Sequence, residues 1–195
     1  MKHLLLIALT VFFYNSRSQA QNLYMDIHYM QPGKVKAEDV AAAHQQDLAI
    51  QKKYSVTFLK YWVDEKNGIV YCLSSAKDSA SVSQTHQHAH GLMPAEILLV
   101  KEGEEAKSMN GNSYFMDIHQ LGAGKVTAED VAAAHKKDLA VQQAHGVQFI
   151  NYWVSEKTGK VFCLSQAPAT ANIVDAHKEA HGLLPNYVEL VKQGQ

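Results

Sequence analysis

The sequence of 195 residues lacks three features that would assign it to common protein classes. It has only two cysteines, too few for the disulfide framework of a small secreted domain. Lysine and arginine number 18 against 19 acidic residues, so the basic excess typical of nucleic-acid-binding proteins is absent. Beyond the N-terminus, no apolar run is long enough to cross a membrane. We therefore expect a soluble globular protein with neither a nucleic-acid partner nor a membrane span.

The N-terminus has the pattern of a secretory signal. A short positive region precedes an apolar run over residues 4–14, which is too short to span a bilayer. Ser18 and Ala20 supply small residues where a signal peptidase reads, which predicts cleavage before Gln21. No cysteine follows the run, so a lipid anchor is not indicated. Residues 1–20 are therefore interpreted as a signal peptide, and the mature protein is expected to be secreted or periplasmic.

The rest of the chain repeats itself at a constant offset, without insertions. The motif at 24–28 returns at 115–119, and the motif at 37–44 returns at 128–135. Matching Tyr-Trp-Val and Cys-Leu-Ser motifs follow in both copies. We therefore expect two copies of one domain, each within the usual domain size. The expected boundaries are 22–102 for the first repeat, 103–113 for a polar linker and 114–193 for the second repeat.

Each copy has the pattern of a βαββαβ unit, the ferredoxin-like arrangement. Alternation predicts strands, the absence of glycine and proline predicts helices, and Asn67-Gly68 predicts a hairpin turn. Asp78 is the expected N-cap of the second helix. In the first copy the expected elements are a strand at 23–29, a helix at 38–54, strands at 56–64 and 69–75, a helix ending at His90 and a strand at 94–100.

The hairpin strands are apolar on both faces. Strict alternation places Leu59, Tyr61 and Val63 on one face of the strand and Phe58 and Trp62 on the other face. A sheet that is apolar on both faces requires cover on both. Two helices cover one face, and the sheet of the other repeat is the expected cover for the second. The predicted fold is therefore α+β: two tandem ferredoxin-like domains packed as a pseudo-dimeric α+β barrel, with pairing to another copy of the chain as the alternative.

Two histidines stand four residues apart near the end of the second helix in each copy. They are His86 and His90, echoed by His177 and His181, and a glycine follows each pair. Four residues make about one helical turn, so both rings of a pair point the same way. Neutral imidazole is the commonest protein ligand for zinc, nickel and copper. Since two adjacent buried imidazoles stabilise each other little without an ion or a proton to share, metal binding is favoured here.

Other polar residues also fall on apolar faces. His44 and Asp47 share the inward stripe of the first helix, as His135 and Asp138 do in the second copy. A buried imidazole and carboxylate one turn apart can pair, so a structural role is favoured for both pairs. On the first strand His28 and Asp26 share one face, and metal binding and a core position are equally supported for His28, as for its equivalent His119. Asp26 is expected to be a strand-edge or supporting group.

The two cysteines, Cys72 and Cys163, occupy equivalent strand positions. A buried free thiol is the favoured interpretation. A bridge between repeats and a thiolate ligand are the alternatives. His88 and His145 lack counterparts in the other repeat and are expected at the surface.

These motifs together resemble a known family. The motifs on which the resemblance rests are Asp-Ile-His on the first strand, Ala-His-x-x-Asp-Leu on the first helix, Tyr-Trp-Val, Gly-x-Val-Tyr/Phe-Cys-Leu and His-x-x-x-His-Gly-Leu-x-Pro. The family comprises small bacterial nickel-binding ferredoxin-like proteins, formerly a domain of unknown function. The resemblance implies a paired barrel and nickel bound through histidines, with zinc or copper permitted by the same donors. The candidate metal ligands are His28, His44, His86, His90, His119, His135, His177 and His181.

The chain departs from this family in being a tandem fusion with an export signal. The favoured function is an exported transition-metal binding protein, most simply for nickel, acting as carrier, buffer or sensor. A small α/β-barrel enzyme using His/Asp acid–base chemistry between sheet and helices is the alternative. No nucleophile elbow, phosphate loop or cofactor fingerprint supports the enzyme.

Overall fold

The computed structural model describes residues 21–103, 105–108 and 111–195, so the expected signal peptide lies outside the described residues. Both repeats have the predicted order of elements. The first repeat contains β1 (Asn22–Tyr29), α1 (Ala37–Ile50), a 3₁₀ turn (Gln51–Tyr54), β2 (Val56–Asp64), β3 (Ile69–Ala76), α2 (Ser79–Ala89) and β4 (Glu96–Glu102). The second contains β5 (Ser113–Gln120), α3 (Ala128–Val141), β6 (Gln148–Ser155), β7 (Lys160–Ala167), α4 (Thr170–Ala180) and β8 (Tyr187–Gly194).

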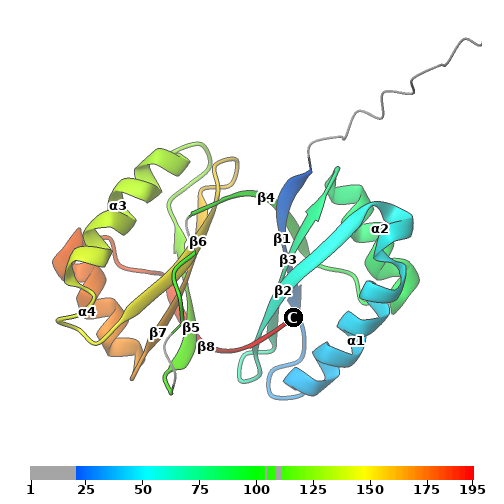
Figure 1. Ribbon diagram of the computed structural model, residues 1–195, viewed down its shortest axis with the longest axis horizontal. Coiled ribbons are helices and arrows are strands. Elements are labelled where there is room, and N and C mark those ends of the chain that lie inside the picture. Colours follow the sequence, from blue (N-terminus) through cyan, green and yellow to red (C-terminus); the bar gives the residue numbers. More distant parts are fainter. Residues whose placement is uncertain (1–20, 104, 109–110) are drawn as a thin grey trace, which may run out of the picture.

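Each repeat forms an antiparallel sheet with its two helices on the outer face (Figure 1). Side-chain caps fix two of the helix starts. The Asp78 carboxylate accepts the backbone N–H of Ser81 at 2.8 Å, as predicted for α2. Thr127 and Asp130 form a capping box at α3. The chain therefore enters its helices where local side chains satisfy the first free N–H groups.

The two sheets close into one barrel because the last strand of each repeat reaches the other repeat. The strand order is β1-β3-β2-β8-β5-β7-β6-β4, and β1 and β4 pair to complete the circle. At the two junctions β4 pairs with β6, and β8 pairs with β2. Figure 1 shows β4 and β8 crossing between the halves. The prediction of a pseudo-dimeric barrel made by one chain is confirmed.

The segment expected to be a linker makes backbone contacts with the second repeat. The N–H of Gly103 bonds to the carbonyl of Tyr152, and the N–H of Ala106 bonds to the carbonyl of Ile150. The chain therefore continues along β6 beyond the end of β4 before it enters β5.

Apolar side chains from both sheets fill the barrel. Trp62 and Trp153 are 0% and 1% exposed, and their ring centroids lie 4.9 Å apart. Around them pack apolar residues from both repeats, including Met25, Ile27, Leu73, Met116, Ile118, Phe162 and Leu164. Cross-strand alternation thus gives each sheet an apolar inner face that is covered by the other sheet.

The prediction of which face each side chain of β2 occupies was wrong near the start of that strand. A β-bulge lies between Phe58 and Lys60, where the register with β3 shifts. Phe58 therefore packs under the helices on the same side as Tyr61 and Val63, while Leu59 and Trp62 face the barrel interior. An extra residue in a bulge interrupts the two-residue period on which the prediction relied.

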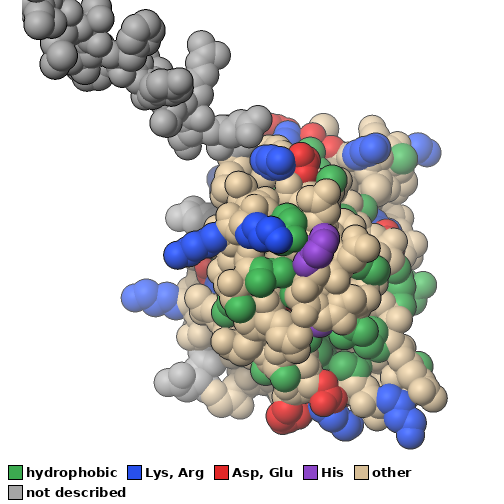
Figure 2. Space-filling model, turned by 90° about the vertical axis from the view of Figure 1, so that its right-hand side faces the viewer, with side chains coloured by type: hydrophobic (Ala, Val, Ile, Leu, Met, Phe, Trp, Pro, Cys, Tyr) green, Lys and Arg blue, Asp and Glu red, His purple; other side chains and the backbone are tan. Residues whose placement is uncertain are grey.

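The face of the molecule shown in Figure 2 carries both acidic and basic side chains. On the face shown in Figure 2, charged side chains of both signs lie mainly around the edge, and a histidine reaches the surface nearer the centre. None of the helices in the described ranges is long and apolar enough to cross a bilayer.

The Trp62–Trp153 contact yields a prediction for the stability of the barrel. Trp62→Ala removes a fully buried ring and the indole N–H that bonds to Gln193 at 2.9 Å. We expect it to lower the free energy of unfolding by about 3–5 kcal/mol, measured by urea denaturation. Leu99→Ala, at a side chain that is 51% exposed, is the control and should change it by less than about 0.5 kcal/mol. A similar effect of both substitutions would contradict this account of the core.

Candidate metal centre

The first strand supplies two polar side chains to the space beneath the helices. Alternation along β1 turns Met25 and Ile27 into the barrel, so Asp26 and His28 face α1 and α2. Asp26 is 0% exposed and His28 is 7% exposed. Their Oδ1 and Nε2 atoms lie 3.0 Å apart. The orientation of His28, which the sequence left open, is therefore toward the helices.

The end of α2 presents two imidazoles side by side. Gly91 adopts a φ of +77°, and the N–H groups of His90 and Gly91 both bond to the carbonyl of His86. The ring centroids of His86 and His90 lie 5.2 Å apart. The backbone N–H of Leu92 donates to Nδ1 of His90 at 3.1 Å, which leaves Nε2 of that ring facing inward. The predicted helix stop thus sets the positions of both rings.

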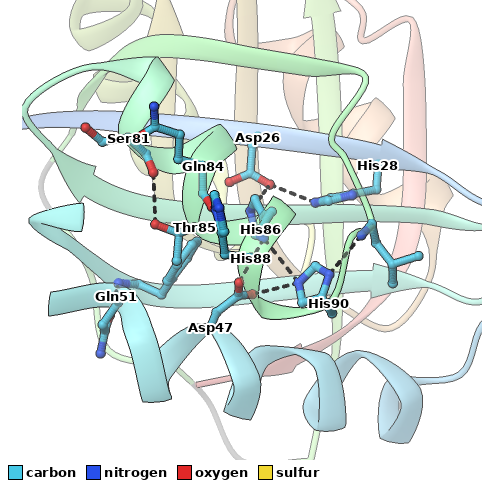
Figure 3. Close-up of polar contacts among 12 residues, drawn as sticks. Asp26, His28, Asp47, Gln51, Ser81, Gln84, Thr85, His86, His88 and His90 are labelled. Carbon is cyan, nitrogen blue, oxygen red and sulfur yellow. Dashed lines mark hydrogen bonds and ion pairs between the residues drawn. The ribbon is translucent and has the colours of Figure 1, made fainter. Parts of the chain in front are cut away.

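Asp47 on α1 closes the group from the opposite helix. Its Oδ1 lies 3.1 Å from Nδ1 of His86, and its Oδ2 lies 3.1 Å from Nε2 of His90. Those two ring nitrogens are themselves 3.3 Å apart. Figure 3 shows the Asp47 carboxylate beside the two imidazoles. We call Asp47, His86 and His90 the helix cluster.

His86 lies between two carboxylates and is 1% exposed. Its Nδ1 contacts Asp47, and its Nε2 lies 3.4 Å from Oδ1 of Asp26. Burial opposes the charged ring, but both carboxylates outweigh burial and raise the pKa of His86 to about 10. Burial likewise opposes ionisation of Asp26 and Asp47, yet their histidine partners hold both pKa values below the ordinary range. Without metal, the group is therefore a buried imidazolium between two carboxylates.

The spacing and chemistry of these donors fit a divalent transition metal. Ligands about 2.1 Å from one ion lie roughly 3.0–3.4 Å apart in octahedral or tetrahedral geometry. The nitrogen and oxygen atoms of the helix cluster have this spacing, and they lie within 4.8 Å of one another. These imidazole and carboxylate donors therefore have both the mutual distances and the ligand chemistry that a divalent transition metal accepts.

A second donor group lies on the strands. Asp26, His28 and Cys72 bring one oxygen, one nitrogen and the sulfur within 4.8 Å of one another, and we call them the strand cluster. Burial, followed by the charge of Asp26, raises the pKa of the Cys72 thiol well above its usual value. Since a thiolate is the form that ligates metal, the helix cluster is the better site.

The second repeat reproduces this arrangement with the same residue types. His177 Nδ1 lies 2.9 Å from Asp138 and its Nε2 lies 3.4 Å from Asp117, while His181 Nε2 lies 3.1 Å from Asp138. Burial opposes the charge on His177, but its two carboxylates raise the pKa to about 10. The helix cluster of this repeat is Asp138, His177 and His181, and the strand cluster is Asp117, His119 and Cys163.

His44 and His135 do not form the pairs predicted for them. Among the described residues no hydrogen bond or ion pair joins His44 to Asp47, whose carboxylate is directed to the α2 histidines. The His44 ring instead packs 4.9 Å from the Tyr61 ring, and burial lowers its pKa. His135 packs in the same way on Tyr152. The prediction was wrong because a carboxylate one turn away on a helix can still point to a neighbouring helix.

The sequence therefore located six of the eight candidate histidines in or beside donor clusters, but it undervalued the carboxylates. Helical spacing pairs Asp47 with His44 and strand position gives Asp26 a supporting role, whereas in the structure both carboxylates contact His86. The alternation that placed Asp26 beside His28 and the stripe that turned Asp47 inward were the signals for both. Both cysteines are buried and free, as favoured.

A cavity of about 90 Å³ lies against the helix cluster of the first repeat, and its equivalent in the second measures about 80 Å³. His44, Val35, Val40, Val70 and Leu92 contribute to the first cavity's wall. The cavity would give water or a small ligand access to an ion held by the three side chains. His88 and His145 lie outside these cavities; His88 is exposed, and His145 contacts Glu179 at 2.8 Å.

Comparison with solved structures supports the fold. A chlorite dismutase mutant from Candidatus Nitrospira defluvii aligns at a TM-score of 0.52 and 8% identity, over 92% of this chain and 93% of that chain. The same enzyme with imidazole aligns at 0.51 and 10% identity, over 91% and 92%. At these identities the likeness concerns the fold alone.

A search of the curated proteins finds no significant match. The crystal structure of SCO4226 from Streptomyces coelicolor A3(2) matches at 29% identity and a TM-score of 0.40, and the match covers 43% of this chain and all of that chain. The profile of the family described as "Nickel responsive protein SCO4226-like" matches residues 24–100 and again residues 115–191. Because that profile matches both repeats, the protein belongs to the SCO4226-like family of nickel-responsive proteins, as a tandem duplication.

Proposed function

We propose that this protein is an exported nickel-binding protein that holds one ion at each helix cluster and acts as a carrier, buffer or sensor. The observation that carries the proposal is the convergence of one carboxylate and two imidazoles beneath the helices of both repeats. In each repeat the donors come from two helices packed on a rigid sheet, so their positions are set before the ion arrives.

Nickel is the proposed ion on two grounds. The family is described as nickel-responsive. Imidazole nitrogen and carboxylate oxygen also suit nickel, although they accept zinc and copper. The high pKa of the buried thiols weakens the case for softer ions that prefer thiolate ligands.

The first prediction concerns the number of ions bound. Titration of the metal-free chain with nickel, followed by calorimetry and elemental analysis, should give two ions per chain. His86→Ala combined with His90→Ala should leave one ion, and adding the equivalent changes at His177 and His181 should leave none.

The control is His88→Ala, which changes an exposed histidine on the same helix that lies outside the cluster. It should leave two ions bound. Full stoichiometric binding by the fourfold variant, with a native far-ultraviolet spectrum, would disprove the proposed site.

The second prediction concerns protons. At neutral pH, the imidazole rings of His86 and His177 are protonated and positively charged, because their pKa values are raised to about 10. An imidazole must lose that extra proton before it can bind a metal ion. Each ion should therefore release at least one proton, and affinity should fall by about tenfold per released proton for each pH unit below neutrality. Calorimetry in buffers of different ionisation enthalpy measures this number. Binding without proton release would contradict the arrangement described for His86.

The third prediction concerns export, which rests on the pattern of residues 1–20. Expression of the full gene in a bacterium should yield a mature chain that begins at Gln21, determined by intact-mass spectrometry of the periplasmic or culture fraction. Ala20→Tyr places a large residue at the cleavage position and should block processing. A chain that keeps residues 1–20 and stays in the cytoplasm would refute export while leaving the metal site unaffected.

A further inference from the structure

A separate cavity of about 360 Å³ lies at the opening of the barrel where the two repeats meet. Its wall includes Tyr29, Tyr71 and Ile27 from the first repeat, and Lys160 and Glu189 from the second. None of these residues belongs to the helix or strand clusters. The cavity is within the size range of small-molecule sites.

Several wall residues occupy equivalent positions in the two repeats, so the pseudo-twofold relation between the repeats passes through this cavity. A dimer of identical subunits would place two copies of each side chain here. In this chain most of the polar positions at the opening differ between the two repeats. Every histidine, aspartate and cysteine of the helix and strand clusters, in contrast, is the same residue type in both repeats. The divergent pairs, in the order first repeat and second repeat, are Tyr29 and Gln120, Ile69 and Lys160, Tyr71 and Phe162, Glu96 and Tyr187, and Leu98 and Glu189.

Glu189 is the most unusual of these residues because it replaces a core leucine. Its equivalent, Leu98, packs in the barrel core, and Glu189 is itself only 8% exposed. The Tyr71 hydroxyl donates to Glu189 Oε2 at 2.7 Å, and within the described ranges it is the sole hydrogen-bond partner of the Glu189 carboxylate. Burial raises the pKa of Glu189, which reflects how little in the protein compensates its charge. Burying a carboxylate that has a single hydrogen-bond partner costs free energy unless a further group pairs with its charge.

The nearby cation does not compensate Glu189. The Lys160 ammonium is held by both oxygens of Glu96, at 2.7 and 2.6 Å, and Tyr29 donates to the same carboxylate at 2.9 Å. Lys160 and Glu96 thus neutralise each other across the two repeats. Within the described ranges, Glu189 is therefore the carboxylate of the cavity wall that has no cationic partner.

Aromatic rings surround this acceptor. Tyr71 and Phe162 form part of the wall, with ring centroids 5.9 Å apart. Tyr29 and Tyr187 are 58% and 56% exposed, although both are large side chains. A carboxylate within aromatic rings is the combination that binds organic cations, through an ion pair and through the negative faces of the rings.

We propose that this opening is a second binding site, selective for a small organic ammonium ion with an apolar body, with the ammonium on Glu189 and the body against the tyrosine and isoleucine side chains. The site exists because the two repeats are fused, which allowed the equivalent positions to differ. It is independent of the metal clusters and of the proposed function.

The test uses the full chain and three matched probes: benzylamine, benzyl alcohol and benzoate. These share one ring and differ in carrying a positive charge, no charge or a negative charge. Calorimetry or chemical-shift titration at neutral pH should show saturable binding of benzylamine, and at least about tenfold weaker binding of the other two.

Two substitutions test the position of the ligand. Glu189→Gln retains the shape of the side chain and should weaken benzylamine binding by at least about tenfold, whereas Tyr71→Phe, which copies the equivalent residue of the second repeat, should weaken it several-fold. Both variants should keep a native far-ultraviolet spectrum and a cooperative urea transition, which shows that they fold. Absence of saturable benzylamine binding, equal binding of benzoate, or full binding by Glu189→Gln would overturn the proposal.

Discussion

The burial of one charged imidazole between two carboxylates constrains the rest of each repeat. His86 lies between Asp26 on β1 and Asp47 on α1 and is almost wholly excluded from water. Each such ion costs several kcal/mol to bury unless its partners are in place, so strand and helices must meet in one arrangement. The helix stop at Gly91 and the alternation of β1 provide that arrangement. A metal ion would replace the proton as the shared cation, and the same geometry therefore serves both states.

Fusion of the two repeats separates two kinds of position. Each helix cluster and each strand cluster lies within a single repeat, beneath its own helices, and both copies have the same residue types. The barrel opening is shared, so two identical chains could offer only symmetric pairs there. The exchange of strands β4 and β8 holds the repeats in a fixed relation, which makes the unlike pair Tyr71 and Glu189 meet. A tandem chain can thus retain one site by repetition and develop another by divergence.

Much of the fold followed from local signals. The Asn67-Gly68 turn, the Asp78 cap and the repeated motifs predicted the βαββαβ order, and the apolar faces of the hairpin predicted a second sheet as cover. The bulge beside Leu59 was not predictable from alternation, because the pattern reads the same with or without an extra residue until the partner strand sets the register. The pairing of each last strand with the opposite repeat likewise depends on contacts distant in sequence.

The candidate metal site, like the fold, could be predicted from the sequence only in part. The sequence by itself determined which side chains turn inward: His86 and His90 by helical spacing, Asp47 by the apolar stripe of α1, and Asp26 with His28 by strand alternation. Only the tertiary structure decided which of them meet, directing Asp47 to His86 and His90 and leaving His44 against Tyr61. The reason is physical: periodicity gives the direction of a side chain about its own element, whereas distances between elements are set by packing in three dimensions.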